Sequence, residues 1–136
     1  MTDFNASVIE EFRANHGKVG GNFENATLLL LHHTGAKSGK ERVTPLGYQK
    51  VGETYAIFGS KAGAPVHPDW FRNVVAHPDV TIEVGDETIA ARARVAEPTE
   101  RDVIYARQVE RAPQFGEYVQ KAAPRIIPVV ILEPVA

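Results

Sequence analysis

Three strand-like runs follow one another in the first half of the chain, and the connections between them are too short to hold a helix. Residues 26–33 form a continuous apolar run typical of a strand buried on both faces, and residues 43–51 and 54–59 form the next two runs, separated only by Gly52 and Glu53. Two parallel neighbours need a crossover of a dozen or more residues, usually a helix. These strands are therefore predicted to pair antiparallel.

The rest of the chain alternates helices with one long hairpin and a closing strand. Capping residues, prolines and periodicity predict helices at 5–15, 68–76, 99–111 and 114–122, a loop at 18–25, a hairpin at 80–84 and 87–96, and a last strand at 126–132 that Pro128 interrupts. The predicted fold class is mainly β (α+β), an antiparallel β-barrel with peripheral helices. We divide the chain into an N-terminal helix and loop at 1–23 and the barrel domain at 24–136.

The composition excludes several classes of protein. The 136 residues carry a formal net charge of −2 and no cysteine, which excludes disulfide scaffolds, thiolate metal sites and cysteine nucleophiles. A dedicated nucleic-acid binder is usually strongly basic, so no nucleic-acid partner is expected. The sequence shows neither a secretory signal nor an apolar run near the roughly 20 residues of a membrane span. We therefore expect a cytoplasmic protein.

An apolar stripe runs along the predicted N-terminal helix. Phe4, Val8, Ile9 and Phe12 share one side of it. The stripe is typical of a helix that packs on its own domain, and the alternative is peripheral contact with the inner face of the cell membrane. Acidic flanks favour packing, because helices that lie on membranes are usually rich in basic residues.

The basic residues gather in one segment of this mildly acidic chain. Residues 34–61 hold five cations against two carboxylates, a net charge of +3. Within this segment the loop after the first strand combines Lys37, Ser38, Gly39 and Arg42. Glycine lets a backbone turn tightly and present its N–H groups, and hydroxyls and cations beside it suit an oxyanion such as phosphate. The alternative is an ordinary charged hairpin loop.

A second loop has a similar composition after the third strand. Residues 59–65 contain Ser60, Lys61 and small residues that allow a flat ring to approach the backbone. On the helix that follows, Trp70 could line one side of such a ring-binding site. On the late helix Phe115 and Tyr118 lie three residues apart, hence on one face, and could cover its mouth or pack in the core.

No metal site and no hydrolytic triad is expected. The adjacent His32 and His33 point to opposite faces of a strand, and the five histidines show no HxxxH or HExxH spacing. A serine nucleophile lacks its GxSxG elbow.

Three segments together resemble a known family of enzymes. They are HTGAKSGKERVTPLGY, IFGSKAGAPVHPDWFRNVVAHPDVTIEVG and IPVVILEP. Over residues 24–134 the chain resembles the deazaflavin-dependent nitroreductases, split-barrel oxidoreductases of actinobacteria that use coenzyme F420. The resemblance implies a split β-barrel like that of the flavin-binding pyridoxamine-phosphate oxidases.

The resemblance also implies roles for matching residues. Lys37, Ser38, Gly39 and Arg42 would contact the phosphate and the oligoglutamate tail of F420. Members of a second group would line or hold the deazaflavin ring: Pro45, Leu46, Ser60, Lys61, Ala62, Gly63 and Ala64, with Trp70 and Asn73 near the cleft. The polyanionic cofactor agrees with the +3 segment.

The resemblance further implies hydride transfer from reduced F420 to a quinone or a similar conjugated or nitro acceptor. Ser60 or Tyr118 would hydrogen-bond the accepting oxygen, and Phe115 and Tyr118 would contact the substrate. The chain departs from the nitroimidazole-activating member of the family, because Ala112 and Phe115 stand where that member has tyrosines. Two alternatives stay open at this point: a non-catalytic F420 carrier and an FMN-dependent split-barrel oxidoreductase. The oligomeric state is left open.

Overall fold

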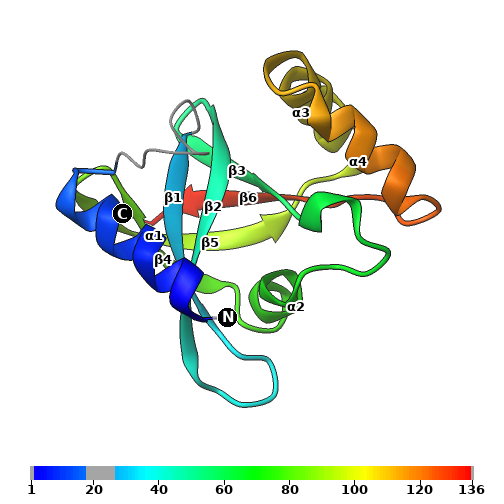
Figure 1. Cartoon of the computed structure of the whole chain (residues 1–136). Coiled ribbons are helices and arrows are strands. Elements are labelled where there is room, and N and C mark those ends of the chain that lie inside the picture. Colours follow the sequence, from blue (N-terminus) through cyan, green and yellow to red (C-terminus); the bar gives the residue numbers. More distant parts are fainter. Residues whose placement is uncertain (1, 18–26, 136) are drawn as a thin grey trace.

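A closed six-stranded antiparallel barrel forms the centre of the molecule (Figure 1). The computed structural model describes residues 2–17 and 27–135, apart from the side chains of residues 2–5 and of residue 62. The strands are β1 (Leu28–Thr34), β2 (Glu41–Val51), β3 (Thr54–Phe58), β4 (Asp79–Val84), β5 (Glu87–Val95) and β6 (Val129–Pro134). Around the barrel they follow the order β1-β2-β3-β6-β5-β4, and pairing of β4 with β1 closes it. The antiparallel prediction is confirmed.

Helices fill the two longer connections and precede the barrel. They are α1 (Thr2–Ala14), the short 3-10 helix η2 (Lys61–Gly63), α2 (Asp69–Ala76), α3 (Pro98–Arg111) and α4 (Gln114–Ala122). The segment η2–α2 joins β3 to β4, and α3 and α4 join β5 to β6. In Figure 1 the pair α3 and α4 stands to one side of the barrel, while α1 lies across β1. The predicted loop at 18–25 and the predicted boundary after residue 23 lie outside the described residues.

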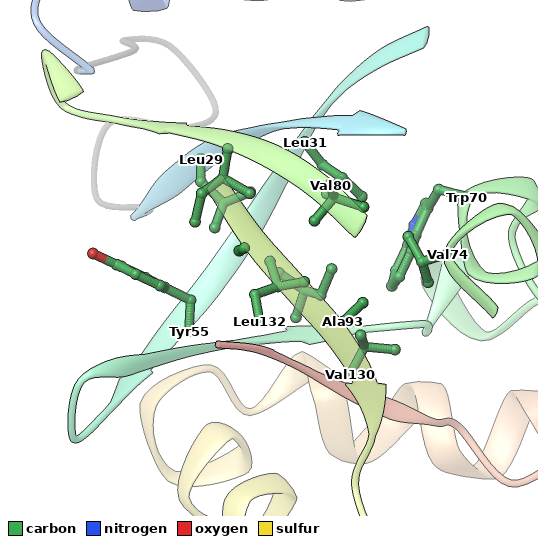
Figure 2. Close-up of a cluster of buried hydrophobic side chains, with 12 residues drawn as sticks. Leu29, Leu31, Tyr55, Trp70, Val74, Val80, Ala93, Val130 and Leu132 are labelled. Atoms are coloured by element: carbon green, nitrogen blue, oxygen red, sulfur yellow. The ribbon is translucent and has the colours of Figure 1, made fainter. Parts of the chain in front are cut away.

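Successive side chains of a strand point alternately into and out of the barrel. The inward side chains form one core, and the outward ones form two more under the helices. Leu29 and Leu31 point into the barrel, together with Tyr55, Ile57, Val130 and Leu132. Trp70 and Val74 of α2 reach the same core from one side (Figure 2). This cluster occupies the inside of the barrel, as period-two strands require.

The opposite faces of three strands are also buried, because helices cover them. Leu28 and Leu30 pack against Val8 and Phe12 of α1. Outer residues of β3 and β6 pack against α3 and α4. This explains why the first strand reads as continuously apolar, and it shows that the stripe of α1 packs on the protein's own barrel. Among the described residues no helix has both the length and the apolar character needed to cross a bilayer.

The last strand begins later than predicted. It runs from Val129 to Pro134 instead of starting at residue 126, so the prediction was wrong at this end. Pro128 precedes the strand and does not interrupt it. Its carbonyl accepts a hydrogen bond from the Gly59 N–H at 2.9 Å, an interaction that needs no N–H from proline.

One buried glutamine on β2 supports a stability prediction. Gln49 is fully buried, and its Nε2 donates to the Ile104 carbonyl at 3.2 Å and to Gln108 Oε1 at 3.1 Å. Its Oε1 has no hydrogen-bond partner among the described residues. A buried carbonyl without a partner costs about 1–3 kcal/mol.

We therefore expect Gln49→Leu to leave the free energy of unfolding within about 1 kcal/mol of the parent or to raise it. Gln49→Ala should lower it by about 2 kcal/mol or more, because it leaves a cavity. Urea unfolding of both variants tests this. A loss above about 2 kcal/mol for Gln49→Leu would contradict it and indicate that Oε1 has a partner such as a buried water.

Candidate functional site

The loop between β1 and β2 and the start of β2 present three cations to solvent. Lys37, Lys40 and Arg42 are exposed, and none has a carboxylate within ion-pair distance among the described residues. Gly39 has φ +72°, a value that favours glycine. The positive charge of this loop is therefore available to an anionic ligand.

Hydrogen bonds inside the same loop hold its shape. The Gly35 N–H donates to the Lys40 carbonyl at 2.8 Å, and the Gly39 N–H donates to the Gly35 carbonyl at 3.0 Å. Ser38 Oγ accepts a hydrogen bond from the Lys40 N–H at 3.2 Å. The Ser38 hydroxyl thus lies inside the turn and still has its own proton to donate.

A buried network fastens this loop to α2. The Ala36 N–H donates to Asn73 Oδ1 at 2.9 Å, and Asn73 Nδ2 lies 2.9 Å from His33 Nδ1. His33 Nε2 lies 2.8 Å from Thr44 Oγ1. Because the Asn73 oxygen is already directed at Ala36, its Nδ2 must donate to His33 Nδ1. His33 therefore carries its proton on Nε2 and donates it to Thr44.

The charge state of His33 agrees with this tautomer. Burial, followed by the charge of nearby Arg42, lowers the pKa of His33 to about 4. The imidazole is therefore neutral at pH 7. Asn73, expected near the cleft, has its side chain buried within the network, and its contact with the cofactor stays a prediction. The sequence did not assign His33 a role in the site, because its partner Asn73 lies 40 residues away along the chain.

The second predicted loop folds into the tight turn around η2. Gly63 has φ +84°, and a Cβ placed on it would lie 2.7 Å from Lys121 Cβ and 3.2 Å from Tyr118 Cα. Only glycine allows this approach, so the turn packs directly on α4. The structure thus brings the backbone of Tyr118 to the turn that contains Ser60, and a shared role of the two residues stays a prediction.

Arg125 lies on the other side of the turn and was not predicted. Its guanidinium donates hydrogen bonds to the carbonyls of Gly59, Ser60 and Ala64 and contacts His67 Nδ1, with distances between 2.8 and 3.0 Å. The available signal was a lone cation in the otherwise apolar segment before β6. Nothing in the spacing linked it to residues 59–64, which are about sixty positions earlier.

α2 lies between the two loops; it contacts the first directly and is linked to the second through His67 and Arg125. In Figure 1 it stands between the β1–β2 loop and η2. Asn73 binds the first loop, and the ring of Phe71 lies 4.8 Å from that of His67, which contacts Arg125. One short helix is thus linked to both loops, directly to the first and through His67 and Arg125 to the second.

Three other predicted residues lie in the inner core or on β2. Trp70 is buried in the inner core with 6% of its surface exposed (Figure 2), so its contact with the cofactor stays a prediction. Pro45 and Leu46 on β2 are half-buried, and Leu46 packs against that core.

The aromatic residues of α4 form one face, as predicted. The rings of Phe115 and Tyr118 lie 5.1 Å apart, and Phe115 also packs on Phe58. Tyr105 of α3 donates its hydroxyl proton to the Phe115 carbonyl at 2.7 Å and thereby ties α4 to α3. Burial raises the pKa of Tyr105 to about 12, so this phenol stays protonated.

Two hydroxyls remain free for a ligand. Neither Ser60 Oγ nor the Tyr118 hydroxyl has a hydrogen-bond partner among the described residues. Within the same part of the chain, no group of three His, Asp or Glu side chains is arranged to hold a metal ion.

Comparison with known proteins identifies the family. The model of the F420H(2)-dependent quinone reductases matches residues 6–134. An F420H(2)-dependent quinone reductase of Mycobacterium tuberculosis is 36% identical over 124 residues, which cover 89% of this chain and 83% of the relative. The chain therefore belongs to the F420H(2)-dependent quinone reductase family.

Solved structures agree with the fold. A structure described as an F420-H2 dependent reductase has 41% sequence identity and a TM-score of 0.71, covering 79% of this chain and 94% of its own. A Listeria innocua protein assigned as a pyridoxamine 5′-phosphate oxidase has 12% identity and a TM-score of 0.58, covering 84% of this chain and 88% of its own. The second likeness concerns the fold alone. The expected split barrel is confirmed.

Proposed function

We propose that this chain is an F420H2-dependent reductase that passes a hydride from the reduced deazaflavin to a quinone or a similar conjugated acceptor. The single observation that carries the site assignment is the set of unpaired cations at Lys37, Lys40 and Arg42, on and beside the β1–β2 loop. Through Asn73 of α2, His67 and Arg125 this loop is linked to the Ser60 turn. Family membership supports F420 over FMN as the cofactor, and an enzyme over a carrier.

The residues present suit this cofactor. The exposed cations and the Ser38 hydroxyl match a phosphate and a chain of carboxylates, because charge-assisted hydrogen bonds are the strong ones. Pro45, Leu46 and the turn from Ser60 to Ala64 are assigned to the deazaflavin ring, where close backbone approach is needed. When bound, reduced F420 supplies the hydride from its C5.

The protein's own groups orient the acceptor and stabilise the negative charge that develops on it. Ser60 and Tyr118 have hydroxyl protons that no described residue engages, so either can donate a hydrogen bond to the acceptor oxygen as negative charge develops there. Phe115 offers a ring face but no phenol, which favours flat conjugated acceptors at this position. A cytoplasmic location and membrane contact through α1 stay predictions. Val8 and Phe12 of the stripe are buried.

A turnover assay tests the function. The protein is mixed with reduced F420 and menadione, and the return of the deazaflavin absorbance is followed for the parent and for Ser60→Ala. Turnover above the control without enzyme is expected, with a lower kcat for Ser60→Ala. Turnover no faster than that control would refute the reductase proposal, and tight F420 binding with no oxidation by several quinones would favour a carrier.

The cation loop supports a separate prediction on affinity. Lys37→Ala should weaken F420 binding about tenfold at low salt, and the difference should shrink at high salt because exposed charges are screened. Fluorescence titration measures this. Lys50→Ala is the matched control: Lys50 belongs to the same basic segment, but its Nζ bonds the Gly52 carbonyl at 3.0 Å. Equal affinity of Lys37→Ala and the parent would remove Lys37 from the site.

A further inference from the structure

Arg125 uses every donor it has on the turn that we assign to the deazaflavin ring. Its Nε donates to the Ala64 carbonyl at 3.0 Å, and its Nη2 donates to the carbonyls of Ala64 at 2.8 Å and Ser60 at 2.9 Å. Its Nη1 donates to the Gly59 carbonyl at 2.9 Å and to His67 Nδ1 at 3.0 Å. A guanidinium has five N–H donors, so all five are engaged. Such a complete set holds several peptide groups in one orientation.

The orientation of these peptides determines where their N–H groups point. In a trans peptide the carbonyl and the N–H point in opposite directions. Because the carbonyls of Gly59 and Ser60 face Arg125, the N–H groups of Ser60 and Lys61 point away from it. Neither N–H has a hydrogen-bond acceptor among the described residues. These two donors are therefore free to meet a ligand.

The charge of Arg125 strengthens the same donors. No carboxylate lies within ion-pair distance of Arg125 among the described residues, so its charge is not neutralised by a partner. A cation that binds a peptide carbonyl polarises the peptide, which makes the N–H on the other end a better donor. The same turn packs closely on α4 at Gly63, where a Cβ would lie 2.7 Å from Lys121 Cβ.

We propose that Arg125 is a positioning residue for the cofactor: it holds the 59–64 turn so that the N–H groups of Ser60 and Lys61 face the polar edge of the deazaflavin ring. The inference rests on the proposed assignment of this turn to the ring. Arg125 does not touch the cofactor and acts through the backbone. Lysine cannot replace it, because a single ammonium cannot span three carbonyls in the planar arrangement of a guanidinium.

Binding of two probes tests the proposal. The first is oxidised F420, and the second is its ring fragment, which carries the deazaflavin and ribityl groups but no phosphate or glutamates. For Arg125→Lys we expect roughly 10- to 100-fold weaker binding of both probes, because the ring loses pre-oriented donors. Lys37→Ala should weaken only F420, because the fragment has no tail. The ratio of the two affinities thus separates an effect on the ring from one on the tail.

Arg101→Lys is the matched control for a purely structural arginine. Its Nε donates to the Ile127 carbonyl at 3.0 Å, close along the chain to Arg125, but it makes no bond to the 59–64 turn. This variant should bind both probes within about twofold of the parent. Amide hydrogen exchange without ligand should rise at residues 59–64 in Arg125→Lys and stay unchanged there in Arg101→Lys.

The outcomes are distinguishable. If Arg125→Lys folds and binds both probes like the parent, the positioning role is refuted while the proposed function stands. If Arg125→Lys weakens only F420, Arg125 acts on the tail and the inference fails. If the parent itself does not bind F420, the proposed function fails, and this inference fails with it.

Discussion

The free energy of unfolding should fall by about 2 to 3 kcal/mol between pH 7 and pH 4.5 because of His33 alone. Burial and Arg42 lower its pKa to about 4 in the folded chain, whereas the unfolded value is 6.5. Between these values the unfolded state binds a proton that the folded state does not, so stability decreases as the pH decreases. Above pH 6.5 both states are neutral, and the contribution of His33 no longer changes.

Protonation of His33 in the folded protein, near pH 4, should loosen the cation loop. A proton on His33 Nδ1 would face the Asn73 Nδ2 donor at 2.9 Å, and two donors repel. Asn73 would then lose its fixed orientation and with it the hydrogen bond to the Ala36 N–H. We therefore expect F420 affinity to fall as the pH approaches 4, where His33 of the folded protein takes up its proton.

Chemical unfolding at several pH values checks the prediction. His33→Gln should lose most of the slope between pH 6.5 and 4.5, and His67→Gln serves as the control because burial lowers the pKa of His67 in the same direction. Below about pH 4.5 carboxylates such as Glu83 contribute as well, since Arg13 lowers the Glu83 pKa. If the dependence of the free energy of unfolding on pH persisted in His33→Gln and disappeared in His67→Gln, it would come from His67 and the prediction would be wrong.

Gly63→Ala should lower the free energy of unfolding by about 2 to 5 kcal/mol. Two costs combine: a left-handed φ of +84° that alanine adopts poorly, and a Cβ that would lie 2.7 Å from Lys121 Cβ and 3.2 Å from the Tyr118 backbone. Because the neighbours are a helix backbone and the base of a side chain, they cannot yield easily. F420 affinity should fall too, since the turn would move off α4.

Gly39→Ala separates the two costs. Gly39 has a similar φ of +72°, but no atom lies within 4 Å of a Cβ placed there. Gly39→Ala should lower the free energy of unfolding by only about 1 kcal/mol, which is the cost of the left-handed backbone conformation alone. Urea unfolding of both variants compares them. Equal losses would show that packing against α4 contributes nothing.

Much of the fold was predictable because its signals are local. Pro68, Asp69 and Pro78 bracket α2, and the structure places this helix at Asp69–Ala76. The short connections between the first three strands excluded a parallel sheet, and the register confirms antiparallel pairing. The start of β6 was predicted three residues too early, because the apolar run alone does not distinguish a strand from the segment before it that contains Pro128.

The two candidate ligand-binding loops could be predicted from the sequence, but the residues that hold these loops in place could not. Lys37, Ser60 and their neighbours could be singled out because charge, hydroxyls and glycine gather within a few positions. His33 and Arg125 could not, because Asn73 lies 40 residues from His33 and the partners of Arg125 lie 58 to 66 residues away in the chain. Isolated residues of this kind look like core or surface residues until the chain has folded.

By itself the sequence determined an antiparallel barrel, a basic segment between residues 34 and 61, and a resemblance to F420-dependent reductases, because strand spacing, charge and motifs are properties of neighbouring residues. Only the tertiary structure decided that α1 packs on β1, that α2 lies between both loops, and that Arg125 orders the 59–64 turn. The physical reason is that burial and hydrogen bonding between distant segments depend on closure of the barrel, which brings them within 3 Å of one another.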